Sequence, residues 1–409
     1  MNEINENNKD TWCVNAFHGL LGMNDGVTKL CCMYEHQKHP RSYPIIGQSP
    51  LSDQMMFSEY MEVRDSLYNG IKHNACTRCW KEEDAGRESK RVRDNKVYFA
   101  SGKKYKPNTL SKIELNLGNT CNIKCRTCDP SSSSLWLKEQ HATRWPHVNY
   151  KTWVIDTEQD RFWKHYTDDS PFWTDIENHL STIKQFDFYG GEPFMSKKMW
   201  KLINSARDKG YAEDIELHYN TNGTLWPEEE LACWEDFEHV SLSFSIDGIG
   251  DRFEFMRHPA KWETVLSHYR KAEQMCDKFG NMSLDWCVTL SSLNLYYLPE
   301  TLEFFFKNIR KRTGLYLNLV HGPLYYNVQY LKNDIKDIIR ERLKLLKQQS
   351  WISDSAAEQV DGIINFMNVD NYKNEVWEEL RQKINVHDDY RKENYYETFP
   401  EMGELIKAK

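Results

Sequence analysis

Three cysteines stand close together in the first half of the sequence, at the spacing C-x3-C-x2-C: Cys121, Cys125 and Cys128. Thiolates at short spacing bind metals, and a 4Fe-4S cluster usually takes four of them, one for each iron. Three ligands leave one iron open, and an open metal position is where a small molecule can bind and react. Taken alone, the motif leaves two alternatives, a zinc site that lacks its fourth ligand or a chance spacing.

The sequence around these cysteines predicts a strand, a loop and a helix. Residues 112–117 alternate apolar and polar side chains, which indicates a strand, and a helix-like sequence begins near 132–137. Five more strands are predicted from alternation or short apolar runs, at 184–189, 214–220, 239–247, 282–290 and 315–321. Helical stretches separate them, for instance 197–208, 261–278 and 299–312.

Six strands that alternate with helices imply parallel βαβ units. The expected fold class is therefore α/β, with an open sheet or a partial barrel of six strands and helices. In such folds ligands bind at the carboxyl ends of the strands, where the cysteine loop also lies. Residues 329–409 are charged and helical in pattern, and we expect them to form a C-terminal helical extension.

Three other predicted strand ends carry residues suited to a charged ligand. Residues 189–193 read Y-G-G-E-P, in which glycines let the backbone approach a ligand and a carboxylate can accept from an ammonium group. Residues 220–223 read N-T-N-G, and residues 243–248 read S-F-S-I-D-G. Arg257 follows, and its planar fork matches both oxygens of a carboxylate. An ordinary Gly-Gly turn and a solvated Arg257 are the alternatives.

Together these motifs resemble the radical SAM superfamily, in which C-x3-C-x2-C lies on the loop after the first barrel strand. The resemblance implies that Cys121, Cys125 and Cys128 hold a catalytic 4Fe-4S cluster and that S-adenosylmethionine chelates its open iron. It also implies that an electron from the cluster cleaves this cosubstrate to methionine and a 5′-deoxyadenosyl radical. That radical would then abstract a hydrogen atom from the substrate.

The same resemblance assigns cosubstrate contacts to the strand ends. These contacts are Gly190, Gly191, Glu192, Asn222, Ser245, Asp247, Arg257 and Val320. The first three match the family's GGEP motif, which binds the amino group of S-adenosylmethionine, and Asn222 lies in a turn like the family's TNG turn. In the peptide-modifying members, a serine and an arginine at the positions of Ser245 and Arg257 hold the ribose and the carboxylate. Val320 lies near the end of the last predicted strand and is expected to touch adenine or substrate.

A second group of cysteines lies nearer the N-terminus: Cys13, Cys31, Cys32, Cys76 and Cys79. Residues 25–27 (D-G-V) predict a hairpin turn whose second arm leads to the adjacent pair, and the last two cysteines form a C-x2-C knuckle. Four thiolates from these segments can enclose either zinc or a 4Fe-4S cluster. A structural zinc ribbon is therefore the alternative to an auxiliary iron–sulfur cluster.

The spacing of this second group resembles the auxiliary-cluster module called SPASM or twitch. The interval from Gly26 to Cys31 fits that family, which favours Cys31 over Cys32 as the ligand. Most relatives carry the module after the barrel, whereas here it precedes the barrel, as in a phage-type set of twitch-domain proteins. The predicted modules are an auxiliary module at 1–108, the partial barrel at 109–328 and the helical extension at 329–409.

Composition limits the partners and the compartment. The net charge of −8 over 409 residues argues against broad binding of nucleic acids. The sequence shows no signal peptide and no long apolar span, so we expect a soluble chain without a membrane partner. Thiolate clusters need reduced cysteines, which favours the cytoplasm, or the host cytoplasm if the protein is phage-encoded.

These observations predict a radical SAM enzyme that oxidises or cross-links a peptide or protein side chain. A reductant such as flavodoxin or ferredoxin would supply the electron, and the auxiliary cluster would bind substrate or accept an electron. The alternative substrate is a small metabolite such as a sugar or a nucleotide. A hypothesis of another class is a non-catalytic iron–sulfur or zinc protein that acts as a binding scaffold.

Overall fold

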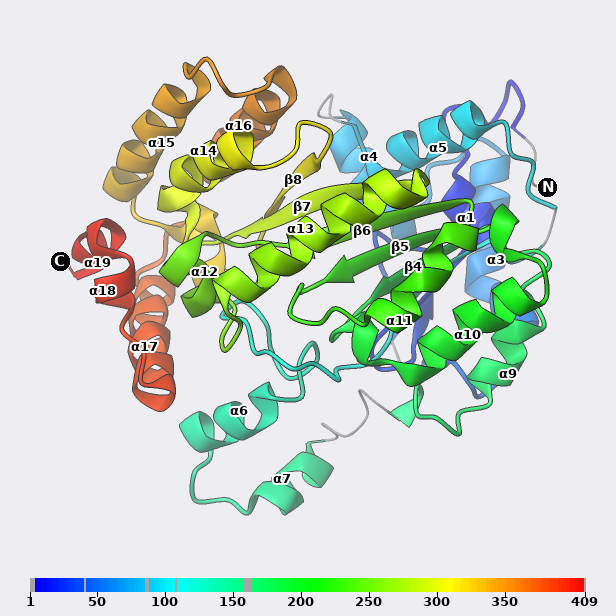
Figure 1. The fold of residues 1–409 in the computed structure, drawn as a ribbon, viewed down its shortest axis with the longest axis horizontal. Coiled ribbons are helices and arrows are strands. Elements are labelled where there is room, and N and C mark those ends of the chain that lie inside the picture. The colour runs from blue at the N-terminus through cyan, green and yellow to red at the C-terminus, as the bar shows by residue number, and fades with distance from the viewer. Residues whose placement is uncertain (1–3, 40–41, 85–87, 107–108, 158–163, 408–409) are drawn as a thin grey trace. The chain divides into compact units, whose positions relative to one another are not determined.

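The computed structural model describes residues 4–39, 42–84, 88–106, 109–157 and 164–407 (Figure 1). The chain divides into two compact units. The first unit comprises 1–120, 158–219 and 227–240, and the second comprises 121–157, 220–226 and 241–409. These units follow other boundaries than the three predicted modules, because the chain passes between them several times. The division into three modules stays a prediction.

In its described residues the first unit holds five strands, in the order β2-β1-β3-β4-β5. Their bounds are β1 (Gly19–Gly22), β2 (Thr28–Lys29), β3 (Lys112–Asn116), β4 (Gln185–Tyr189) and β5 (Glu216–Thr221), whose last two residues belong to the second unit. Strands β1, β3, β4 and β5 pair in parallel, with Lys112 opposite both Gly19 and Gln185. The predicted hairpin turn joins β1 to β2, which pair antiparallel, and Gly26 adopts φ +80° there. The parallel pairing of β1 with β3 was not predicted.

Helices precede and follow these strands along the chain. They are α1 (Val14–His18), α2 (Leu51–Met55), α3 (Ser58–Tyr68), α4 (Thr77–Asp84), α5 (Lys90–Ser101), α9 (Phe172–Glu177), α10 (Lys197–Asp208) and α11 (Glu228–Leu231). Helix α10 begins where the Ser196 hydroxyl accepts a hydrogen bond from the Met199 amide at 3.2 Å. In the core of this unit, Tyr219 stacks on Phe188 and on Trp234, each at a ring distance of 5.1 Å.

The second unit continues the alternation of strands and helices. Its strands are β6 (His239–Ser245), β7 (Met282–Leu290) and β8 (Gly314–Leu319), in that order, and the first two residues of β6 belong to the first unit. Strands β7 and β8 pair in parallel from Asp285 opposite Gly314 to Leu290 opposite Leu319. The helices of this region are α12 (Gly250–Met256), α13 (Trp262–Phe279) and α14 (Leu298–Asn308).

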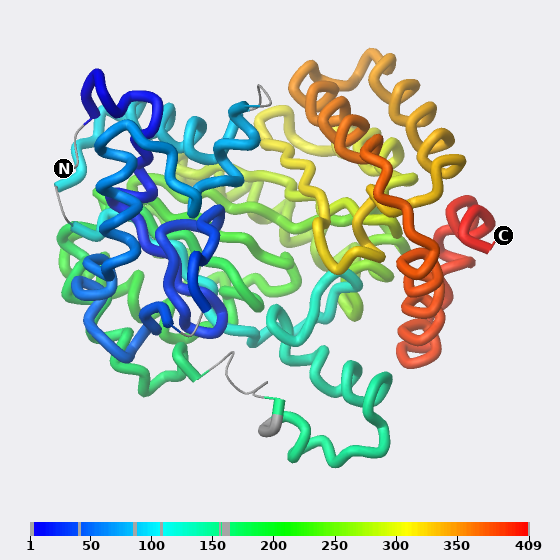
Figure 2. The backbone as a smooth tube through the Cα atoms, turned by 180° about the vertical axis from the view of Figure 1, so that it is seen from behind, coloured from blue at the N-terminus to red at the C-terminus, as the bar shows by residue number. Residues whose placement is uncertain are grey.

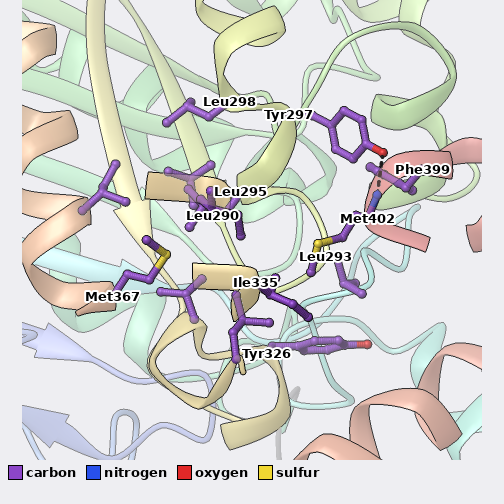
Figure 3. Packing of buried hydrophobic residues seen from close by; sticks show 14 of the residues in the cluster. Leu290, Leu293, Leu295, Tyr297, Leu298, Tyr326, Ile335, Met367, Phe399 and Met402 are labelled. Carbon is purple, nitrogen blue, oxygen red and sulfur yellow. Dashed lines mark hydrogen bonds between the residues drawn. The ribbon is translucent and has the colours of Figure 1, made fainter. Parts of the chain in front are cut away.

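The C-terminal part of the second unit is helical, as Figure 2 shows in orange to red. Its helices are α15 (Asn333–Lys347), α16 (Asp354–Met367), α17 (Asn374–Arg391), α18 (Tyr395–Thr398) and α19 (Pro400–Lys407); α6 (Trp136–Arg144) and α7 (Tyr150–Asp156) also belong to this unit. The apolar faces of α15 to α19 share one core with β7 and α14, including Leu290, Ile335 and Met367 (Figure 3). The Met402 amide donates to the Tyr297 hydroxyl at 3.2 Å within this core.

The predicted fold class is confirmed. All six predicted strands are present as β3 to β8, parallel pairing runs from β3 to β5 and from β7 to β8, and the C-terminal region is helical. The helix predicted at 197–208 has these bounds in the structure, and the other two are shifted by a few residues at one or both ends. In the part of the chain that the structure describes, no helix is both long enough and apolar enough to cross a membrane.

Candidate functional site

The cysteine loop follows β3, as the sequence predicts. Cys121 and Cys125 are buried and Cys128 is half-buried. The first residues of the following segment fix the loop, because the Ser133 hydroxyl donates to the Ile123 carbonyl at 2.6 Å and the Trp136 indole donates to the Cys125 carbonyl at 3.0 Å. The loop therefore presents its thiols from a backbone that is held on one side by α6.

The thiols of the loop interact with each other and with a buried cation. A hydrogen bond from Cys128 lowers the pKa of Cys125 to about 7 against the effect of burial, and the positive charge of Arg257 adds to the lowering. A thiolate, not a thiol, is the metal ligand, so this environment suits metal binding. Among the described residues, no three His, Cys, Asp or Glu side chains already form a site for a single metal ion. In a cubane each thiolate meets a different iron.

Asn222, a predicted cosubstrate contact, lies against the cysteine loop. Its side-chain amide faces the Cys121 sulfur at 3.8 Å and donates to the Asn122 side chain at 2.9 Å. Its carbonyl oxygen accepts from the amide and hydroxyl of Thr224 at 2.9 and 2.6 Å. An amide hydrogen bond to a ligand sulfur tunes the potential of an iron–sulfur cluster. Asn222 is therefore placed to act on the cluster, while its cosubstrate role stays a prediction.

Arg257 is buried in an ion pair and is not solvated. Its Nη1 donates to Asp247 Oδ2 at 2.5 Å, and Asp247 Oδ1 accepts from the Thr289 amide at 2.8 Å. Burial alone would lower the pKa of Arg257, but the nearby Cys125 and Asp247 raise it above its usual value. Asn294 completes the arrangement by donating to the Asp247 carbonyl at 2.9 Å. The Arg257 guanidinium is thus held as a fixed positive charge near the cysteine ligands.

Ser245 and Val320 are the remaining predicted cosubstrate contacts of the second unit. Ser245 is the last residue of β6 and is half-buried. Val320 follows β8 and is half-buried against the apolar core, and its amide donates to the Leu290 carbonyl at 3.0 Å. Their contact with the cosubstrate stays a prediction.

The G-G-E-P segment of the first unit forms a tight turn after β4. Gly190 and Gly191 adopt φ +77° and +54°, in the left-handed region that favours glycine. A Cβ atom on Gly191 would lie 2.1 Å from the Thr120 carbonyl oxygen, which accepts from the Glu192 amide at 2.9 Å. Thr120 directly precedes Cys121 in the sequence. The turn is therefore bonded to the residue from which the cysteine loop starts.

Glu192 is buried, with 2% of its surface exposed. One of its carboxylate oxygens accepts from the Phe194 amide at 3.2 Å, which caps a short 3₁₀ helix at Pro193–Met195. A buried carboxylate suits an ammonium group. The assignment of Glu192 to the amino group of the cosubstrate stays a prediction.

Four of the five N-terminal cysteines line one pocket of the first unit: Cys13, Cys31, Cys76 and Cys79. Cys32 is not among the lining residues and is exposed. Burial raises the pKa of each of these four thiols, to about 11 for Cys13. Neighbouring ionisable groups raise these pKa values further, and for Cys13, Cys31 and Cys76 those groups include other cysteines of the pocket. A bound metal cation would offset the unfavourable burial of the thiolate form, since a metal-coordinating thiol is deprotonated outright. The donor set therefore fits a thiolate-bound metal centre.

Sequence reasoning missed several charged residues next to the cysteine loop. Lys124 and Arg126 lie between the cysteines and are held by carboxylates, from α6 for Lys124 and from the C-terminal region for Arg126. The partner of Lys124 is Glu139, which is fully buried on α6. A charged residue in the buried face of a helix is the one signal that the sequence offered for this partner.

Comparison with known proteins places these residues in a family. Residues 115–304 match the model of the radical SAM superfamily, and no curated protein matches the chain. Among solved structures, the chain is similar to native anSMEcpe with bound AdoMet, at 17% identity over 58% of this chain and 58% of that chain, with a TM-score of 0.37. This chain thus spans less than two thirds of that structure.

Two further similar structures come from Streptococcus suis. SuiB bound to S-adenosylmethionine is 11% identical over 73% of this chain and 61% of that chain, with a TM-score of 0.34. SuiB bound to the precursor peptide SuiA is 11% identical over 82% of this chain and 67% of that chain, with a TM-score of 0.32. The family match covers the cysteine loop, the G-G-E-P turn and Arg257. Residues 115–304 therefore match the radical SAM superfamily, which is a superfamily of enzymes.

Proposed function

We propose that this protein is a radical SAM enzyme that modifies a peptide or protein side chain by oxidation or cross-linking. The observation that carries the proposal is the buried loop with Cys121, Cys125 and Cys128 inside the segment that matches the superfamily model. When bound there, a 4Fe-4S cluster with S-adenosylmethionine supplies a 5′-deoxyadenosyl radical for abstraction of a hydrogen atom. A one-electron donor such as flavodoxin or ferredoxin would provide the reductant.

The candidate site residues have distinct tasks in this proposal. The cysteines bind as thiolates, and the Arg257 charge favours that form in Cys125. Asn222 stabilises negative charge on the Cys121 sulfur through its amide. Glu192 holds the amino group of the cosubstrate, and Ser245, Asp247 and Arg257 orient its ribose and carboxylate. The burial of Cys121 and Cys125 restricts water at the reacting centre.

The four-cysteine pocket holds an auxiliary 4Fe-4S cluster in the same proposal. Its support is the shared pocket of Cys13, Cys31, Cys76 and Cys79, together with the SPASM-like or twitch-like spacing of these residues. Cys13, Cys31, Cys76 and Cys79 would hold this cluster, which would supply a site for substrate binding or an electron acceptor. Zinc remains the alternative occupant, since four thiolates suit either centre.

A cavity beside Cys128 supports a substrate site in the second unit. It has a volume of about 520 Å³, and its aromatic lining residues are Trp136, Tyr325 and Tyr326. Aromatic walls give a large and rigid contact surface for a side chain. The same volume falls within the ordinary range for sites of small molecules. A sugar or nucleotide therefore remains the second candidate substrate.

The deciding experiment is anaerobic reconstitution followed by dithionite and S-adenosylmethionine, with 5′-deoxyadenosine read by mass spectrometry. We expect the product with the wild type and with Cys233→Ala, a matched variant at another buried cysteine, and none with Cys125→Ala. Iron should number about eight per chain and fall to about four in Cys76→Ala, which tests the auxiliary cluster separately. A chain that retains zinc and takes up no iron would refute the proposal in favour of a binding scaffold.

A further inference from the structure

The cysteine loop carries two cations among its proposed ligands, and both are turned away from solvent. Lys124 precedes Cys125 and Arg126 follows it. Only 2% of the Arg126 surface is exposed. Cations in such surroundings persist only when carboxylates or other acceptors compensate them. The origin of these acceptors links the loop to the C-terminal helices.

Arg126 is held by two carboxylates from the end of the chain. Its Nη2 donates to Asp388 Oδ1 and to Glu393 Oε2, each at 2.5 Å. The guanidinium also lies 4.1 Å from the centroid of the Phe255 ring. The second oxygen of Glu393 meets His258 Nδ1 at 2.5 Å. Asp388 lies on α17 and Glu393 is the second residue after its end, so the C-terminal extension supplies both partners of this loop residue.

Lys124 is held through a carboxylate that α17 also contacts. Its Nζ donates to Glu139 Oε2 at 2.6 Å. The other oxygen of Glu139 meets His387 Nδ1 at 2.8 Å, and Arg391 Nε approaches both oxygens at 2.9 and 3.0 Å. Burial alone would raise the pKa of Glu139, but His387, Arg391 and Lys124 lower it to about 2. Glu139 is therefore a buried anion that joins the loop to α17.

The backbone of the loop is paired on its other side with the segment that carries Arg257. The Lys124 amide donates to the His258 carbonyl at 2.7 Å, and the Arg126 amide donates to the Met256 carbonyl at 2.8 Å. The loop and the segment around Arg257 thus form one hydrogen-bonded pair. Any displacement of the loop would shift Arg257 relative to the cysteines.

We propose that α17 and the residues after it are a positioning device for the reactive cluster. The network contains three permanent cations (Lys124, Arg126 and Arg391) and three carboxylates (Glu139, Asp388 and Glu393), so its charges balance. Removal of one member leaves an uncompensated buried charge, which is far more disruptive than the loss of a surface pair. In this proposal Arg126 and Glu393 are positioning residues that act through the loop. This inference rests on the proposed function, because it assumes that the loop binds a cluster.

The test compares Arg126→Met with Arg342→Met in the full-length reconstituted protein. Arg342 is a matched control in the same unit, because it pairs with Glu300 at 2.7 Å and lies 4.2 Å from the Tyr296 ring, distant from the loop in sequence. The signal is the change in the EPR spectrum of the reduced protein on addition of S-adenosylmethionine, which reports on the reactive cluster. The size of this EPR change is followed over time during exposure to an iron chelator. We expect the reactive cluster to be lost about 10- to 100-fold faster in Arg126→Met than in Arg342→Met, as for other residues that orient metal ligands.

A second matched pair of variants separates the loss of a charge from misfolding. Glu393→Gln keeps the shape of the side chain and removes one charge, and Glu300→Gln does the same at the control pair. Circular dichroism checks that each variant is folded, and Arg126→Lys should partly restore the cluster because it keeps the cation. Equal cluster survival in Glu393→Gln and Glu300→Gln would overturn the positioning role. A wild type that gives no response to S-adenosylmethionine would refute the proposed function instead, so the two failures are distinguishable.

Discussion

Replacement of Gly191 by alanine tests whether the G-G-E-P turn is built by close backbone approach. Gly191 has φ +54°, and a Cβ atom there would lie 2.1 Å from the Thr120 carbonyl oxygen. Gly250 is a matched control, because it has the same φ of +54° and no atom within 4 Å of an added Cβ. The left-handed conformation costs an alanine about 1–2 kcal/mol at either position. Any excess cost at Gly191 therefore measures the contact with Thr120.

The contact of the added Cβ with Thr120 makes a second contribution to the loss of stability, and its size can be estimated. A group inserted into a packed site forces backbone shifts that cost about 1–3 kcal/mol. We expect Gly191→Ala to destabilise the folded protein by about 2–5 kcal/mol in total and Gly250→Ala by about 1–2 kcal/mol. For a unit of this size each kcal/mol corresponds to about 2–4 °C in Tm. The shift of Thr120 should also break its 2.9 Å hydrogen bond from the Glu192 amide.

The assay is thermal unfolding of both variants under anaerobic conditions, followed by a titration with S-adenosylmethionine. Gly191→Ala should unfold at the lower temperature and bind the cosubstrate more weakly, whereas Gly250→Ala should differ little from the wild type in binding. Equal Tm values for the two variants would show that the turn tolerates a side chain. The reasoning from the Thr120 contact would then be wrong.

Three further predictions follow from the contacts of single residues. Asn222→Leu removes the amide that faces the Cys121 sulfur at 3.8 Å, so redox titration should show a reactive-cluster potential lower by on the order of 60 mV, a tenfold change in a one-electron equilibrium; an unchanged potential would contradict this role. Glu139 has its pKa lowered from 4.5 to about 2, so its contribution to stability is complete above pH 4.5 and is lost as the pH falls through 2; chemical unfolding of the metal-free protein should show a shallower dependence over this range in Glu139→Gln. Cys31→Ser should lose about four irons per chain and Cys32→Ser none, because only Cys31 lines the four-cysteine pocket; equal iron counts would mean that the two cysteines can exchange as ligands.

Local patterns in the sequence were sufficient to predict the strands and the cysteine loop. The alternation in 112–117 reflects a strand that buries Ile113 and Leu115, and the loop begins where that alternation ends. The hairpin around Gly26 was also predictable, because its signal lies within a few residues. Such features depend on neighbours in the chain, which the sequence displays directly.

Contacts between distant segments were not predictable in this way. Arg126 and Asp388 are separated by 262 residues, and nothing in the short loop indicates that its cation meets α17. The parallel pairing of β1 with β3 joins residues about 90 positions apart, and a four-residue strand gives only a weak signal. The burial of Arg257 likewise depends on Asp247 and on the packing around it. These outcomes are set by tertiary packing, which a single sequence does not display.

The place of β1 beside β3 has a consequence for any attempt to separate the N-terminal segment from the rest. Strand β3 is paired on both sides, with β1 at Gly19 to Gly22 and with β4. A chain that starts at residue 109 would lack β1 and leave β3 with a row of unsatisfied N–H and C=O groups. Exposed edges of this kind recruit strands from other molecules, so the shortened chain should self-associate. The N-terminal hairpin thus protects β3, the strand that precedes the cysteine loop, from aggregation.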